Sequence, residues 1–110
     1  MKKIIILAIT LTTLRLMAQE TTKTDTFKVW GNCEMCEKRI ESAALKVKGV
    51  KSAEWDAVKG IMNLVYTPSE TSIETVQKAI AEAGYDTEKV KADDKAYAKL
   101  PGCCQYNRKE

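Results

Sequence analysis

Two cysteines three positions apart, Cys33 and Cys36, are the side chains of this sequence best suited to chemistry. They lie in the run V-W-G-N-C-E-M-C-E-K-R-I, residues 29–40, where an apolar strand pattern changes to a charged helical one. In the first turn of a helix, residues three apart face the same way, with Cβ atoms roughly 5–6 Å apart. A disulfide needs Cβ atoms about 3.8 Å apart, whereas two thiolates on one metal ion hold their sulfurs up to roughly 4.6 Å apart. The spacing suits a metal ion directly and a disulfide after adjustment, so both stay open.

The residue types present in the chain limit which metal ions such a pair would bind. The free N–H groups and the positive end of a helix dipole favour the thiolate form, which a soft metal and a disulfide exchanger both require. The chain has four cysteines and no histidine, so sulfur is its main metal-binding group. Thiolates without imidazole favour thiophilic ions such as Cu(I) or Hg(II). Zinc would need four ligands, and the second cysteine pair lacks the CxxC spacing.

That second pair, Cys103 and Cys104, lies near the C-terminus. Adjacent cysteines do not easily form an unstrained disulfide with each other, and two exposed free thiols are a liability in an oxidising compartment. Our hypothesis is that this segment folds back and adds both sulfurs as further ligands to the ion at Cys33 and Cys36. A disulfide role and incidental thiols are the alternatives.

The elements that must position these cysteines follow from the hydrophobic pattern. Period-two alternation predicts strands at 26–29, 50–56 and 61–66 and a weak strand at 85–90, and helical spacing predicts helices at 36–47 and 73–83. This order, β-α-β-β-α-β, is the ferredoxin-like arrangement. It predicts an α+β fold in which both helices lie on one face of a four-stranded antiparallel sheet.

The first eighteen residues have the pattern of a targeting segment and are not part of the predicted domain. Two lysines, a short apolar stretch and Ala18 are typical of a secretory signal peptide at 1–18, cleaved before Gln19. The apolar stretch is too short for a membrane span, and an uncleaved anchor is the alternative. All of the formal net charge of +3 belongs to this segment, so a neutral mature chain gives no reason to expect nucleic acid or stable membrane association. We expect a periplasmic or secreted protein.

The mature chain divides into three parts. Residues 19–25 are polar and threonine-rich and are predicted to be a flexible lead-in. Residues 26–90 form the predicted domain, which is of a size for one modest core. Residues 91–110 form a C-terminal extension with the Cys-Cys pair and a short helix predicted within 93–100.

A succession of residues around the CxxC motif resembles the heavy-metal-associated domain family, which includes small copper chaperones, metal-binding domains of copper-exporting ATPases and the periplasmic mercury-binding protein. The matching residues are Cys33, Cys36, Arg39, Ile40, Glu41, Ala43, Gly49, Val50, Tyr66, Thr67, Pro68, Ala79, Ile80, Ala83, Gly84 and Tyr85. The resemblance implies that Cys33 and Cys36 are the metal ligands and that Tyr85 lies near them. The family has a methionine two residues before its first cysteine, where this chain has Gly31. Met35, inside the motif, is expected at the surface or in packing.

These observations predict a protein that is not an enzyme: it captures Cu(I) on Cys33 and Cys36 and transfers it by stepwise thiolate exchange. The partner would be a metal-exchanging protein such as a transporter or another metal-binding domain. Hg(II) or another soft ion is the alternative cargo, because the same ligands suit it. A thiol–disulfide oxidoreductase is the alternative from another class, although such enzymes need a longer chain with parallel strands.

Overall fold

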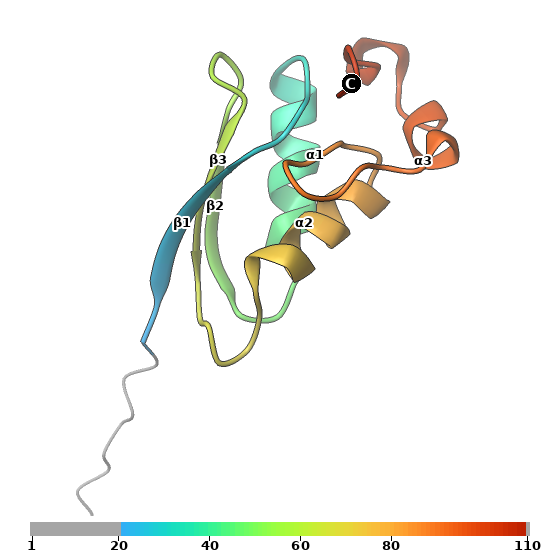
Figure 1. The fold of residues 1–110 in the computed structure, drawn as a ribbon. Coiled ribbons are helices and arrows are strands. Elements are labelled where there is room, and N and C mark those ends of the chain that lie inside the picture. Colours follow the sequence, from blue (N-terminus) through green and yellow to red (C-terminus); the bar gives the residue numbers. More distant parts are fainter. Residues whose placement is uncertain (1–20, 110) are drawn as a thin grey trace, which may run out of the picture.

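The computed structural model describes residues 21–109, whose strands form an antiparallel sheet in the order β1-β3-β2. β1 spans Lys23–Lys28, β2 spans Val50–Asp56 and β3 spans Ile61–Tyr66. β2 and β3 are joined by the predicted turn at 57–60. Figure 1 shows the sheet as one layer and the helices as a second layer. The predicted signal peptide lies outside the described residues.

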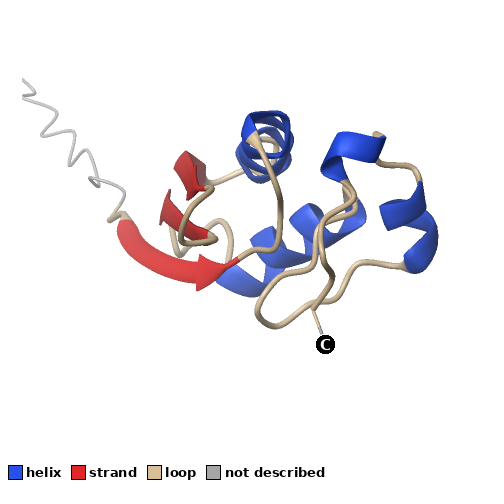
Figure 2. Ribbon diagram, turned by 90° about the horizontal axis from the view of Figure 1, so that it is seen from above, coloured by secondary structure: helices blue, strands red, loops and turns tan. Residues whose placement is uncertain are grey.

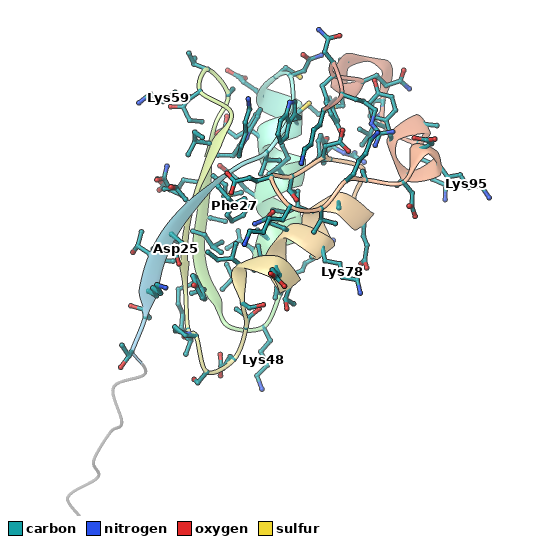
Figure 3. The ribbon with its side chains drawn as sticks, in the orientation of Figure 1. Asp25, Phe27, Lys48, Lys59, Lys78 and Lys95 are labelled. Carbon is teal, nitrogen blue, oxygen red and sulfur yellow. The ribbon has the colours of Figure 1, made fainter. Side chains whose placement is uncertain are left out.

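Side chains alternate between the two faces of the sheet, and one face is apolar. Phe27 of β1, Met62 of β3 and Trp55 of β2 occupy neighbouring register positions and are almost fully buried. In Figure 3, Phe27 lies between β1 and the helices, whereas Lys48 and Lys59 project from the periphery. Because burial of one such side chain contributes about 1.5–3 kcal/mol, this row stabilises the end of the sheet from which the cysteine loop leaves β1.

Two helices cover the apolar face, as predicted (Figures 1 and 2). α1 spans Glu34–Leu45 and buries Cys36, Ile40 and Ala44, which are four positions apart on one side of the helix. α2 spans Ile73–Glu82, and the Ser72 hydroxyl caps it by accepting a hydrogen bond of 3.2 Å from the Thr75 N–H. Each helix therefore has one apolar stripe against the sheet and a charged face toward solvent.

The C-terminal extension contains two short elements, α3 at Asp94–Ala98 and a 3₁₀ helix, η1, at Gly102–Cys104. α3 confirms the short helix predicted within 93–100. After α3 the chain returns to the N-terminal end of α1, where η1 lies beside the cysteine loop (Figure 1). Within residues 21–109, no helix is both long and apolar enough to cross a membrane.

The prediction of a fourth strand at 85–90 is wrong. Within the described chain the sheet has three strands, and this segment adds one isolated bridge, between Thr87 and Val29. The Thr87 N–H and hydroxyl both donate to the Val90 carbonyl at 2.8 Å, which closes a turn. Residues 86 and 88 still make backbone hydrogen bonds with Trp30 and Lys28, but the turn at Thr87–Val90 ends this pairing after one bridge.

The predicted start of the first strand, at residue 26, is also wrong. The strand begins at Lys23 and includes Thr24 and Asp25, which were expected in the flexible lead-in at 19–25. Lys23 pairs with Tyr66 of β3, and the Tyr66 hydroxyl donates to the Asp25 carboxylate at 2.7 Å. Threonine is also a good strand former. Pairing with β3 therefore orders a segment whose polarity had indicated a linker.

Candidate metal site

Cys33 and Cys36 lie at the N-terminal end of α1. Cys33 is the N-cap residue, with extended backbone angles, and Cys36 lies in the first turn. Their sulfur atoms are 3.9 Å apart, and all four cysteines are free thiols. Cys36 is fully buried, whereas Cys33 is partly exposed. The pair thus presents one anchored sulfur and one that solvent or a partner reaches.

The two thiols differ in acidity. The backbone N–H groups of Cys36 and Met35 stabilise the Cys33 thiolate and lower the pKa of Cys33 below its ordinary value. Burial disfavours the charged form of Cys36 and raises its pKa. Cys33 therefore ionises first and is the more nucleophilic sulfur for an incoming soft ion.

Trp55 supports the loop that carries Cys33. Its indole N–H donates to the Val29 carbonyl at 3.0 Å, and its ring lies against Gly31. A Cβ atom on Gly31 would lie 2.8 Å from the ring carbon Cη2 of Trp55 and 3.0 Å from Cδ1 of Ile40. The ring occupies the space that the family's methionine would need, so Gly31 and Trp55 together replace it. The sequence pattern, which predicts only a strand at 50–56, did not indicate this role of Trp55.

Tyr85 lies under the cysteines, as the resemblance implied. Its ring is fully buried and stacks on Tyr106 of the extension, with centroids 5.7 Å apart. Burial raises the pKa of Tyr85 strongly, and the neighbouring sulfurs of Cys104 and Cys36 add to the effect. Among the described residues its hydroxyl oxygen has no hydrogen-bond partner. A neutral hydroxyl donor therefore lies beside the sulfur atoms.

The extension brings the second cysteine pair to the first. The sulfur atoms of Cys33, Cys103 and Cys104 all lie within 4.8 Å of one another. Cys103 also contacts Met35, with 3.7 Å between the two sulfur atoms, and its carbonyl oxygen is 3.7 Å from the Cys33 sulfur. The predicted folding back of Cys103 and Cys104 onto the CxxC loop is thus confirmed. Their role as ligands stays a prediction.

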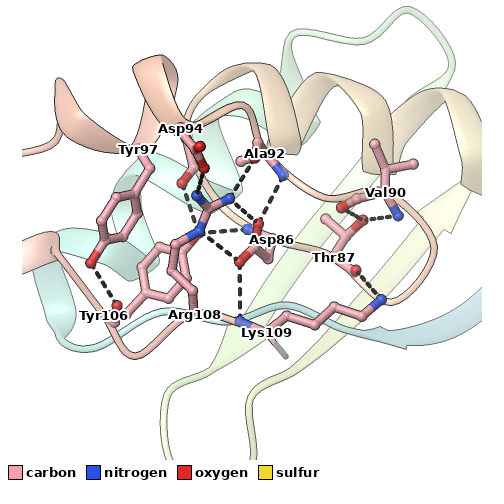
Figure 4. A network of polar contacts seen from close by, with 10 residues as sticks. Asp86, Thr87, Val90, Ala92, Asp94, Tyr97, Tyr106, Arg108 and Lys109 are labelled. Carbon is pink, nitrogen blue, oxygen red and sulfur yellow. Dashed lines mark hydrogen bonds and ion pairs between the residues drawn. The ribbon is translucent and has the colours of Figure 1, made fainter.

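A polar network attaches the extension to the domain (Figure 4). The buried Asp86 carboxylate binds the Arg108 guanidinium at 2.8 Å and accepts hydrogen bonds from the N–H groups of Ala92 and Lys109. The Tyr106 hydroxyl donates to the Gly84 carbonyl and accepts from the Asp86 N–H, at 2.8 and 2.7 Å. Sequence analysis missed this network. Its one signal is the aromatic and basic composition of the tail after Cys104.

Comparison with known proteins is consistent with this geometry. The model of the heavy-metal-associated domain matches residues 26–86. The copper chaperone CopZ of Staphylococcus haemolyticus (strain JCSC1435) is 38% identical over 55 residues, which are 50% of this chain and 81% of that protein. The predicted resemblance is therefore confirmed. The family match ends at residue 86, so Cys103 and Cys104 lie outside it.

Solved structures agree with the α+β fold. Oxidized MerP from Ralstonia metallidurans CH34 has a TM-score of 0.59 and 29% identity, covering 62% of this chain and 96% of that one. The N-terminal domain of a potential copper-translocating P-type ATPase from Bacillus subtilis, in its Cu(I)-loaded state, has a TM-score of 0.58 and 28% identity. The match covers 61% of this chain and 85% of the chain in that structure. The predicted fold class is confirmed, with three strands in place of four.

Proposed function

The chain belongs to the heavy-metal-associated domain family, and from this premise we propose that it captures Cu(I) on Cys33 and Cys36 and passes it to a partner protein. The observation that carries the proposal is the pair of thiols 3.9 Å apart at the start of α1. Thiolates bind Cu(I) strongly, and the N–H groups at the helix start lower the pKa of Cys33. The similar proteins include a copper chaperone and the N-terminal domain of a potential copper-translocating ATPase.

Transfer proceeds by exchange of thiolate ligands. A thiolate of the partner approaches on the side of Cys33, because Cys36 is buried and less accessible. It forms a new metal–sulfur bond as the bond to Cys33 breaks, and a second thiolate of the partner then binds as the bond to Cys36 breaks. Each step forms one bond and breaks one, and the ion keeps its oxidation state. The partner is a transporter domain or another metal-binding domain with exposed thiols.

Hg(II) is the second candidate cargo. The similarity to MerP favours it, and two thiolates suit Hg(II) as well as Cu(I). We also propose that the protein acts after export, because residues 1–18 have the pattern of a signal peptide. Mass spectrometry of protein recovered from the producing cells tests cleavage: a chain that begins at Gln19 supports a cleaved signal peptide, and an intact Met1 contradicts it.

Metal binding is tested with reduced, full-length protein under strict exclusion of oxygen. Cu(I) and Hg(II) are titrated separately against a competing chelator, with the wild type beside the double variant Cys33→Ser/Cys36→Ser. We expect the double variant to lose about 100-fold or more in affinity. Lys48→Ala, an exposed change far from the sulfurs, is the control. Wild-type affinity in the double variant would contradict the proposal, and efficient reduction of insulin disulfides without metal would favour the oxidoreductase instead.

A further inference from the structure

The separations between sulfur atoms indicate how many of them an ion at this site contacts. With metal–sulfur bonds of about 2.3 Å, two sulfurs on opposite sides of an ion lie about 4.6 Å apart, whereas three sulfurs around it lie about 4.0 Å apart. The sulfurs of Cys33 and Cys36 are 3.9 Å apart, and those of Cys103 and Cys104 are 4.0 Å apart. Both separations are shorter than the roughly 4.6 Å of two sulfurs on opposite sides of an ion and close to the spacing for three. An ion bound by either pair at this spacing has room for a further sulfur.

Cys104 lies where a third ligand is needed. It is fully buried, although it belongs to a short segment near the end of the chain. Its sulfur lies within 4.8 Å of that of Cys33 and interacts with that of Cys36. The Cys103 sulfur is also within 4.8 Å of that of Cys33, but Cys103 is exposed and contacts Met35. The extension therefore offers one buried and one exposed sulfur.

The extension is held in place by contacts outside the sulfur cluster. Arg108 pairs with the buried Asp86, and Tyr106 hydrogen-bonds to the backbone of residues 84 and 86. Tyr97 also packs edge-on against Tyr106 and donates to its carbonyl at 2.8 Å. Because these contacts need no metal, the sulfurs are ordered before an ion binds. Such preorganisation removes an entropic cost from binding.

The Tyr85 hydroxyl gives an independent sign of a ligand at this place. It is buried beside the sulfurs of Cys104 and Cys36, and no hydrogen-bond partner exists for it among the described residues. A buried hydroxyl without a partner costs free energy. Once the neighbouring thiols become metal-bound thiolates, the hydroxyl has a sulfur acceptor with negative charge. A negatively charged sulfur at this place would therefore suit the buried Tyr85 hydroxyl better than a neutral thiol.

We propose that the C-terminal extension completes the metal site, with Cys104 as a third thiolate ligand beside Cys33 and Cys36 and Cys103 as an outer, weaker fourth. This inference rests on the proposed function and specifies how that site retains its ion. Each thiol that becomes a ligand loses its proton to solvent as the metal–sulfur bond forms, and no electron is transferred. A partner must therefore displace Cys104 as well as the CxxC pair, which slows release.

The test compares Cys104→Ser, Cys103→Ser and the double variant with the wild type, all as full-length reduced protein. Cu(I) is titrated against bathocuproine disulfonate, and X-ray absorption counts the sulfurs around the ion. We expect the double variant to lose about tenfold or more in affinity, with Cys104→Ser responsible for most of the loss. The number of sulfurs should fall from three or more in the wild type to two in the double variant.

A fourth variant, Tyr106→Phe, tests whether the attachment of the extension affects binding when all four thiols are present. It keeps all four thiols and weakens only the attachment of the extension, so its affinity should lie between those of the wild type and the double variant. Cys103→Ser changes an exposed residue, so the fold is expected to be retained. Circular dichroism of each variant checks the fold.

The outcomes that overturn the inference are distinct from those that overturn the function. Wild-type affinity and two sulfurs around the ion in every protein with an intact CxxC would show that the extension contributes no ligand. The function would then still be supported by loss of binding in Cys33→Ser/Cys36→Ser. Wild-type affinity in that variant would instead overturn the proposed function and this inference with it.

Discussion

The CxxC loop and the C-terminal extension both place two cysteines at the same end of the molecule, but they are held there in different ways. The loop is built into the core: Cys36 belongs to the apolar stripe of α1, and Trp55 fills the space under Gly31. The extension adds Leu100, Cys104 and Tyr106 to the core and is also attached by hydrogen bonds and the Asp86–Arg108 ion pair. Because these polar contacts come from a few residues, we expect their removal to loosen the second pair more than the first. The predictions below test this difference.

Trp55→Ala should have the largest effect on stability. It removes a ring that is 3% exposed and empties the space under the loop, so we expect a loss of about 3–5 kcal/mol in the free energy of unfolding. Urea unfolding followed by circular dichroism measures it. Trp30→Ala is the matched control: Trp30 is half-buried and contacts Lys28 and Lys109, and its loss should cost about 1–2 kcal/mol. Equal losses would contradict a special role for Trp55.

Arg108→Ala should mainly affect the extension. It leaves the buried Asp86 carboxylate with only its backbone donors, so about 1.5–3 kcal/mol should be lost. Hydrogen exchange should show faster exchange at the amides of Cys104 and Tyr106, with the amides of β3 still protected. Arg39→Ala removes an exposed arginine from α1. It should change neither the free energy of unfolding nor the exchange of the amides of Cys104 and Tyr106. Uniform loss of protection across the sheet would show that the extension and the core unfold together.

Tyr106→Phe should have a smaller effect of the same kind. It removes the two hydrogen bonds of the hydroxyl, to Gly84 and Asp86, and keeps the stacking on Tyr85. Each hydrogen bond contributes about 0.5–1.5 kcal/mol, so the loss should be about 1–3 kcal/mol. Thermal unfolding with the same hydrogen-exchange readout measures it. An increase in stability would contradict the structural role of these bonds.

Acid should weaken the extension before the core. Burial alone would raise the pKa of Asp86, but the Arg108 guanidinium and the N–H groups of Ala92 and Lys109 outweigh it and lower the pKa below its ordinary value of 3.8. The stabilisation is therefore fully present above that pH and is lost as the pH falls through the folded-state pKa. Arg108→Ala removes the largest of the causes that lower this pKa, so the loss should begin at a higher pH. Tyrosine fluorescence and hydrogen exchange followed from pH 7 to 2 compare the two proteins.

Local parts of the structure were predictable because short-range patterns decide them. Cys33 and Cys36 fall at a helix start, and the stripe of Ile40 and Ala44 predicts which side of α1 faces the sheet. Gly84, with a φ of +109°, ends α2 as the sequence indicated. The end of the chain was predicted in outline only: α3 and the return of Cys103 were expected, and the contacts that hold them were not.

The sequence by itself determined the CxxC pair, both long helices and the three strands, because hydrophobic periodicity and helix capping act over a few residues. Only the tertiary structure decided that residues 85–90 form a turn, that Trp55 supports the cysteine loop and which contacts hold the extension in place. Each depends on contacts between residues far apart in the chain, such as Asp86 with Arg108. Such a pairing follows from how the whole chain packs, because a buried carboxylate needs a partner and the fold decides which residue can reach it.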